Sequence, residues 1–296
     1  MRIGLVDIDG HNFPNLALMK LAAWHKAQGD TAVLTTPEDV GDFDCGYASK
    51  VFSFTPMPEL PGSFEIGGAG VNLSKSLTEE IEHICPDYDL YGLDYSLGFL
   101  TRGCVRKCPW CVVPEKEGAI HAHADIEEFA RHRDVVLMDN NVLASDHGLR
   151  QIEKIAAMNL RMDFNQGLDA RLIDDGVARL LAKVKWLKPI RLACDRSDMI
   201  PHVQKAVELL RWHNATPRAY FVYVLVKDIG DALERIRFLK MLNVDPFAQP
   251  FRDFKTNAEP TAEQKAFARW VNHKAIFKSV LWEDYRREKT QEVSDG

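Results

Sequence analysis

The sequence predicts an α/β protein in which a small Rossmann-like domain precedes a partial (βα)6 TIM-like barrel and a C-terminal helical segment. Two observations support this prediction. Strand-like apolar runs alternate with amphipathic helical stretches along most of the chain, and paired glycines follow one of the early runs. The 296 residues suffice for one small and one large domain, and the expected boundaries are 1–88, 89–255 and 256–296.

The first domain begins with a β-α-β unit. Apolar runs at 2–8 and 31–36 flank a stretch at 14–29 that starts with proline and spaces its apolar residues three and four apart. A third apolar run at 45–54 leads to a proline-rich loop and to the sequence GGAG at 67–70, which suits a tight turn after a strand. The segment is too short for a complete doubly wound domain.

The second domain is indicated by strands that recur about every thirty residues, each followed by a helical stretch, which is typical of a βα barrel. Because six units are found rather than eight, we expect a partial barrel. Helical stretches at 202–213 and 231–242 carry apolar residues on one face, which we expect to pack against the sheet. From residue 261 onward, a helical region with aromatic residues is expected to close one end of the barrel. The expected strands are 91–98, 134–139, 161–166, 189–194, 218–226 and 243–250.

Composition and charge give no support to several classes of protein. The chain has 37 Lys and Arg against 43 Asp and Glu, a net charge of −6, so it gives no strong nucleic-acid signal. It contains no run of about 20 apolar residues, and its start lacks the basic and then apolar layout of a secretion signal. We therefore expect a cytoplasmic protein with no membrane partner.

Three of the six cysteines lie within eight positions, in the sequence TRGCVRKCPWC at 101–111. In a cytosolic-looking chain, such thiols are more often metal ligands than parts of a disulfide framework. Three thiolates on one loop can hold a 4Fe-4S cluster by three of its irons, which leaves the fourth iron open to another ligand. These three residues, Cys104, Cys108 and Cys111, are the expected metal ligands.

Two other interpretations of the three cysteines remain open. A structural zinc site ordinarily has four protein ligands. It would need a distant cysteine (Cys45, Cys85 or Cys194) or one of the loop histidines, His121 and His123. A redox disulfide between Cys108 and Cys111 would leave Cys104 without a role.

The spacing CxxxCxxC, with Trp110 directly before the third cysteine and the loop following the first expected barrel strand, resembles the signature of the radical S-adenosylmethionine (SAM) superfamily. The resemblance covers residues 90 to 255. It implies that SAM chelates the open iron and that the reduced cluster cleaves SAM to methionine and a 5′-deoxyadenosyl radical, which removes a hydrogen atom from the substrate. It also implies a reducing electron donor that is flavodoxin- or ferredoxin-like. Such a radical needs an enclosed place, which the mouth of a barrel supplies.

If the cluster loop follows the first barrel strand, SAM lies across the carboxyl ends of the strands. The second strand ends in LMDNNV, where the family usually has GGE or a variant of it. By this resemblance Asp139, Asn140 and Asn141 would accept hydrogen bonds from the methionyl ammonium, and Trp110 would also belong to the SAM site. The alternative is an Asx turn that caps the next helix.

Other strand ends offer further expected SAM contacts. After the third strand, Gln166 and Asp169 would contact ribose hydroxyls and Arg171 would pair with the methionyl carboxylate. The alternative is that Asp169 caps a helix and Arg171 faces solvent. The fourth and sixth strands add a rim of polar residues and, by resemblance to the family, an adenine edge; their expected contacts are Asp195, Ser197, Phe247 and Gln249.

A Rossmann-like segment before a radical SAM barrel is similar to the layout of cobalamin-binding radical SAM enzymes. Asp9 and His11 match part of the DxHxxG loop in which histidine ligates cobalt, but Pro14 stands where that loop has glycine. We therefore expect no cobalamin, and a degenerate domain that contacts substrate or covers the barrel.

These observations predict a radical SAM enzyme that abstracts hydrogen from an unidentified substrate, a small molecule or a macromolecule. One alternative is a cobalamin-dependent radical SAM methyltransferase. A second is a non-catalytic iron-sulfur electron carrier, and a third is a zinc-stabilised protein that binds nucleic acid.

Overall fold

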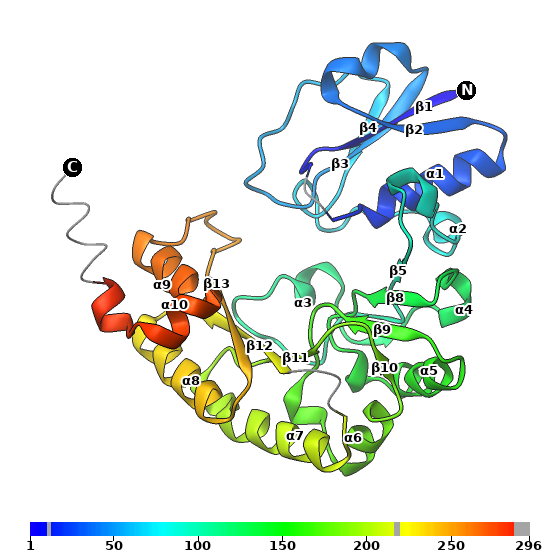
Figure 1. The fold of residues 1–296 in the computed structure, drawn as a ribbon. Helices are drawn as coiled ribbons and strands as arrows, with labels where there is room; N and C mark the ends of the chain where they lie inside the picture. The colour runs from blue at the N-terminus through cyan, green and yellow to red at the C-terminus, as the bar shows by residue number, and fades with distance from the viewer. Residues whose placement is uncertain (11–12, 216–219, 287–296) are drawn as a thin grey trace, which may run out of the picture. The chain divides into compact units, whose positions relative to one another are not determined.

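The computed structural model describes residues 1–10, 13–215 and 220–286 (Figure 1). It confirms an α/β protein with parallel sheets. The chain divides into two compact units, Met1–Met162 and Asp163–Gly296, and the division falls inside strand β9 (Arg161–Phe164). The boundaries expected near residues 88 and 255 stay predictions. His11 and the end of the expected C-terminal helical segment, from residue 287 onward, lie outside the described residues.

The first unit begins with a parallel sheet in the order β2-β1-β3-β4. The predicted strands at 2–8 and 31–36 are confirmed, but the predicted strand at 45–54 is too long. Residues 50–54 leave the strand because the Asp9 carboxylate accepts hydrogen bonds from the backbone amides of Val51 and Phe52 and turns the chain away. The strands are β1 (Arg2–Asp7), β2 (Thr31–Thr35), β3 (Cys45–Ser49) and β4 (Phe64–Gly67).

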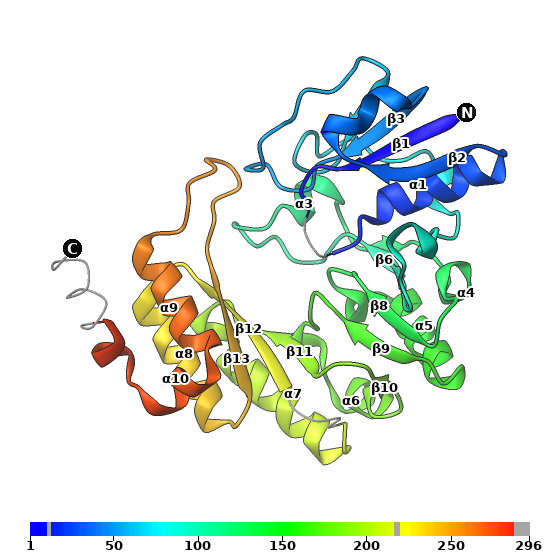
Figure 2. The same ribbon diagram turned by 45° about the horizontal axis from the view of Figure 1, so that its top comes forward.

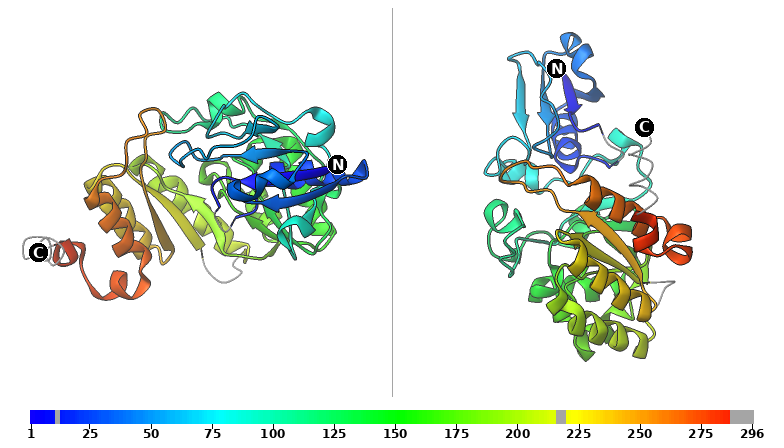
Figure 3. Two further views of the ribbon diagram at one scale, coloured as in Figure 1. Left: turned by 90° about the horizontal axis from the view of Figure 1, so that it is seen from above. Right: turned by 90° about the vertical axis from the view of Figure 1, so that its left-hand side faces the viewer.

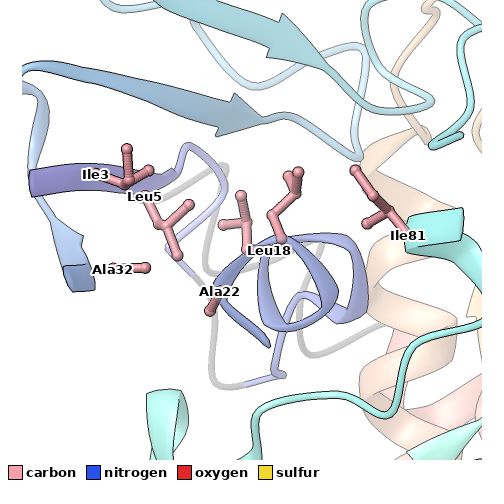
Figure 4. Packing of buried hydrophobic residues seen from close by; sticks show 7 residues of the cluster. Ile3, Leu5, Leu18, Ala22, Ala32 and Ile81 are labelled. Atoms are coloured by element: carbon pink, nitrogen blue, oxygen red, sulfur yellow. The ribbon is translucent and has the colours of Figure 1, made fainter. Parts of the chain in front are cut away.

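Helix α1 (Leu16–Ala27) covers one face of this sheet. Asn15 caps it by accepting a hydrogen bond from the Leu18 amide. Buried side chains of α1 meet those of β1, β2 and α2 (Glu79–Glu82) in one apolar cluster (Figure 4). Removing a leucine side chain from such a core typically costs about 2–5 kcal/mol of stability. The residues labelled in the figure are Ile3, Leu5, Leu18, Ala22, Ala32 and Ile81.

The predicted strand at 91–98 was wrong in its first half. The 3-10 helix η2 (Tyr88–Tyr91) occupies the start of that segment and ends at Gly92, whose φ is 61°. Only β5 (Ser96–Gly98) is extended, and it pairs in parallel with β8 (Asp134–Leu137). The first unit also contains β6 (Thr101–Arg102), α3 (Val113–Lys116), β7 (His121–Ala122), α4 (Ile126–Phe129) and α5 (Asp146–Ala157).

The second unit contains a parallel sheet in the order β11-β12-β13, which confirms the last three predicted strands. Residues of β12 alternate between buried and half-buried, so one face packs against helices while the other stays partly open. Helix α8 contacts β12; both elements are labelled in Figure 2. The elements are α6 (Asp175–Leu181), β10 (Lys185–Trp186), β11 (Ile190–Ala193), α7 (Ile200–Trp212), β12 (Tyr220–Val226), α8 (Ile229–Met241) and β13 (Asp245–Pro250).

Helices α9 (Ala262–Asn272) and α10 (Lys274–Ser279) form the predicted helical region after the last strand (Figure 3). The side-chain amide of Asn272 accepts a hydrogen bond from the Ala248 backbone amide and donates one to the Ala248 carbonyl. These two bonds fix α9 beside β13. Trp270 packs edge to face with Phe277 and at a tilt with Trp282, so the aromatic residues at helical spacing form a core. None of the helices in the described parts of the chain has the length and apolar character needed to cross a bilayer.

Candidate functional site

The three clustered cysteines lie on a hairpin, residues 101–122, which we call the cysteine hairpin. Its neck is the antiparallel pair β6–β7, in which Thr101 faces Ala122. At Gly103 the backbone has a φ of 79°, and a Cβ there would lie 2.2 Å from the Ala119 carbonyl oxygen. The Cys104 amide donates to the Gly118 carbonyl at 3.2 Å. Glycine at position 103 therefore lets the two arms of the hairpin approach this closely.

The three cysteines of the hairpin form no disulfide and lie on one loop. Cys104 is half-buried, and its sulfur accepts hydrogen bonds from the Arg106 amide at 3.3 Å and the Asn141 side chain at 3.4 Å. The Cys111 amide donates to the Cys108 carbonyl at 3.0 Å, across a turn that contains the half-buried Trp110. No disulfide joins Cys108 to Cys111.

The remaining cysteines belong to apolar cores. Cys45 and Cys85 pack at the edges of two clusters in the first unit. Cys194 is buried in the second unit, and burial raises the pKa of its thiol to about 12. His123 pairs with Glu82, because its Nε2 atom lies 3.4 Å from the Glu82 carboxylate. These placements leave His121, which is exposed on β7, as the side chain nearest in sequence for a fourth ligand.

The described residues contain no preformed group of three or more His, Cys, Asp or Glu side chains gathered around a metal position. The donor chemistry of the hairpin nevertheless fits an iron-sulfur cluster, because such clusters take thiolate ligands. Cys104, Cys108 and Cys111 lie on one loop outside any disulfide, and no other cysteine lies on the hairpin.

Glu117 joins the two arms of the cysteine hairpin to the end of β8. Its carboxylate accepts hydrogen bonds from the Gly103 amide at 2.9 Å, the Asn140 side chain at 2.8 Å and the Arg102 guanidinium at 3.1 Å. The side chain is only 10% exposed. Both carboxylate oxygens are therefore used in holding the neck, and we call this set of contacts the Glu117 clamp.

A second carboxylate, Glu82 of α2, holds the other side of Arg102. Arg102 donates to it at 2.9 Å, and the Lys20 ammonium lies 3.2 Å from it. Burial alone would raise the pKa of Glu82, but the hydrogen bond from His123 and the charges of Lys20 and Arg102 hold it well below its usual value. Arg102 also lies over the Phe99 ring, 3.6 Å from its centroid, so its position is fixed on several sides.

The three polar residues predicted at the end of the second barrel strand lie at the base of the cysteine hairpin. Asp139 is buried, and its carboxylate accepts from the Thr101 amide at 2.6 Å, the Thr101 hydroxyl at 2.7 Å and the Leu100 amide. Burial raises the pKa of Asp139 to about 6 despite these hydrogen bonds. The Asn140 side chain donates a hydrogen bond to the Glu117 carboxylate, and the Asn141 side chain donates one to the Cys104 sulfur.

The Asx-turn alternative for these residues is wrong. Ser145 caps the next helix, α5, by accepting from the Gly148 amide. Asn141 precedes the short 3-10 turn η3 (Val142–Ala144) without a side-chain capping bond. The expected contact of all three residues with the methionyl ammonium stays a prediction.

The predicted SAM contacts after β9 make local interactions. Asp169 caps the 3-10 turn η4 (Ala170–Leu172) and pairs with the Arg171 guanidinium at 2.7 Å, so the capping alternative is confirmed for Asp169. Arg171 is exposed but paired, and Gln166 is exposed. Their predicted roles toward SAM are not tested by these contacts.

The remaining predicted contacts of the second unit lie along the sheet. Asp195 accepts from the Leu225 amide at 3.1 Å, and burial raises its pKa. Ser197 donates to Asp231 at 2.6 Å. Phe247 packs against Phe221 with 5.1 Å between ring centroids, on the half-buried face of the sheet, whereas Gln249 is exposed.

Sequence reasoning missed Glu117, Arg102 and Glu82. Glu117 belongs to the run EKEG, in which nothing distinguishes a clamp from a solvated charge. Its partner Asn140 is separated from it by 23 residues, so only the folded chain brings them together. Comparison with known proteins adds no family to these observations, since neither any family model nor any curated protein matches the chain.

Proposed function

We propose that the protein is a radical SAM enzyme that binds a 4Fe-4S cluster through Cys104, Cys108 and Cys111. The observation that carries this proposal is that three cysteines outside any disulfide share one hairpin with a glycine-fixed neck, while the other cysteines belong to apolar cores. When bound, such a cluster supplies the electron that cleaves SAM to methionine and a 5′-deoxyadenosyl radical, which takes a hydrogen atom from the substrate.

The chain's own residues have positioning roles in this proposal. The Glu117 clamp and Asp139 hold the peptide from Leu100 to Gly103, so Cys104 follows directly after a fixed segment of backbone. Asn141 donates a hydrogen bond to the Cys104 sulfur, which helps to orient that side chain. Phe99 and Trp110 are the aromatic residues nearest to this turn in sequence, and they would limit the access of water.

The wider architecture in this proposal is a partial (βα)6 TIM-like barrel. Parallel pairing of β5 with β8, and of β11, β12 and β13, supports it, because βα barrels are built from parallel strands. The proposal also includes a cytoplasmic location, a flavodoxin- or ferredoxin-like electron donor and an unidentified substrate.

The decisive experiment is anaerobic reconstitution of the full chain with iron and sulfide, followed by dithionite, SAM and chromatography for 5′-deoxyadenosine. We expect a brown protein with 5′-deoxyadenosine as product. Cys104→Ala, Cys108→Ala and Cys111→Ala should each lose both, whereas the matched control Cys85→Ala should keep both because Cys85 lies in an apolar cluster.

Other outcomes separate the alternatives. A cluster that forms without 5′-deoxyadenosine would favour an iron-sulfur electron carrier over an enzyme. A colourless protein that binds one zinc with all three cysteines would refute the proposal. Transfer of a methyl group only when cobalamin is added would identify the methyltransferase instead.

A further inference from the structure

Strand β2 forms one edge of the four-stranded sheet in the first unit. It is hydrogen-bonded to β1 on one side, and in the order β2-β1-β3-β4 no strand of the described residues pairs with its other side. An edge strand presents a row of backbone donors and acceptors that another chain can pair with. The contacts between β2 and its neighbour show which groups lie on that row.

The backbone groups of β2 alternate between β1 and the outside. The Thr31 amide donates to the Met1 carbonyl at 2.9 Å, so the polar groups of Thr31 point toward β1. Because a strand repeats every two residues, those of Val33 point the same way, whereas the amides and carbonyls of Ala32 and Leu34 point outward. Within residues 1–10, 13–215 and 220–286, no hydrogen bond is made to these outward groups.

β2 lacks the features by which proteins protect a sheet edge. Its sequence, TAVLT, contains no charged residue and no proline, the residues that commonly block such pairing. The side chains of Val33 and Leu34 are 40% and 37% exposed. Ala32 is buried in the apolar cluster shared with α1 and β1, which anchors the strand (Figure 4). An uncharged, anchored and exposed edge favours the addition of a further strand.

The outward backbone groups are complementary to those of a second copy. A twofold axis through Val33, perpendicular to the sheet, makes the two β2 strands antiparallel and places Val33 opposite Val33 of the second copy. Ala32 of each copy then lies opposite Leu34 of the other. These are the residues whose amides and carbonyls point outward, so each such pair exchanges both of its backbone hydrogen bonds.

The side chains fit the same register. Thr31 lies opposite Thr35 of the second copy, so the cross-strand pairs beside Val33 are formed by β-branched residues. Asp30, the charged residue directly before the strand, lies opposite Thr36. Between residues 30 and 36, therefore, no charge faces a like charge across the contact.

We propose that β2 pairs with β2 of a second copy of this chain, antiparallel about Val33, and so joins two four-stranded sheets into one continuous sheet. The contact is small, so we expect an association that depends on protein concentration rather than a permanent dimer. Neither the cluster nor SAM enters this argument, so the proposal stands separately from the proposed function.

Sedimentation velocity of the full chain, over about a hundredfold range of micromolar concentrations, measures the association. We expect the sedimentation coefficient to rise from that of a monomer to that of a dimer. Val33→Lys places two ammonium groups opposite each other and should weaken dimerisation at least about tenfold. Val71→Lys is the matched control, because Val71 is 45% exposed and follows β4 at the other edge of the sheet; it should change dimerisation by less than about twofold.

Cysteine substitution tests the register. Residues opposite each other in a non-hydrogen-bonded antiparallel pair have Cα atoms about 4.5 Å apart, which a disulfide can bridge. Mild oxidation of Val33→Cys should therefore join two chains at position 33, as identified by mass spectrometry of the digested protein. Thr35→Cys alone should not be joined at position 35, whereas a mixture of Thr31→Cys and Thr35→Cys should be joined between positions 31 and 35.

Three outcomes would overturn the proposal. The first is a monomer at every concentration, which would leave the edge to solvent or to a different protein. The second is a dimer that Val33→Lys leaves unchanged. The third is a dimer in which Val33→Cys forms no disulfide between the two copies of position 33.

Discussion

The ends of strands β8 and β9 differ in how their polar side chains are used. At the end of β8, Asn140 reaches Glu117 and Asp139 reaches Thr101, which are 23 and 38 residues away in the chain. After β9, Asp169 pairs with Arg171, only two residues away. Long-range bonds hold a loop in place, whereas local bonds shape a single turn. Substitutions at the end of β8 should therefore disturb the cysteine hairpin, whereas the effects of substitutions after β9 should stay within one turn.

The largest expected effect is at the neck of the hairpin. Gly103→Ala should destabilise the first unit by about 3 kcal/mol, because it combines a positive φ with a Cβ 2.2 Å from the Ala119 oxygen. The control is Gly118→Ala, where φ is also positive but no atom lies within 4 Å, and about 1 kcal/mol is expected. Denaturant unfolding followed by circular dichroism measures both, and equal losses would refute the steric explanation.

Glu117→Gln tests the long-range contacts directly. The substitution removes the charge that faces Arg102 and turns one acceptor into a donor opposite Gly103 and Asn140, so we expect a loss of about 2 kcal/mol. It should also lower the iron content after reconstitution, measured per chain. A variant as stable as the wild type would show that the Glu117 clamp does not hold the hairpin.

Asp139 predicts a pH dependence. Its pKa in the folded protein, about 6, lies above the ordinary value of 3.8, so the folded state binds the proton more tightly than the unfolded chain. This contribution to stability is full below 3.8 and is lost as the pH rises through about 6, with a slope of at most about 1.4 kcal/mol per pH unit. Asp139→Asn lowers stability at every pH but should lack this slope; parallel profiles for the two proteins would contradict the assignment.

The smallest effect is expected in the second unit. Asp169→Asn keeps an acceptor for the Arg171 amide and loses only a partly exposed ion pair, so the cost should be below about 1 kcal/mol. Iron content after reconstitution should not change. A loss as large as that of Glu117→Gln would remove the distinction between the two strand ends.

The contrast between local and distant contacts also explains what sequence reasoning could predict. The α/β class, most strands and the Asp169 cap depend on residues within a few positions of one another, and the structure confirms them. The expected strands at 45–54 and 91–98 were too long because Asp9 and Gly92 redirect the chain there. Glu117 and Arg102 were missed because their partners come from other parts of the chain.

The closed neck of the cysteine hairpin has a consequence for how a metal centre would be assembled and repaired. All three sulfur donors come from one short loop, so bringing them together costs little chain entropy. The first-unit core around Leu18 and Ile3 uses none of these residues. Oxygen could therefore strip iron from the loop while the sheet stays intact, and new iron and sulfide could rebuild the centre without refolding the chain.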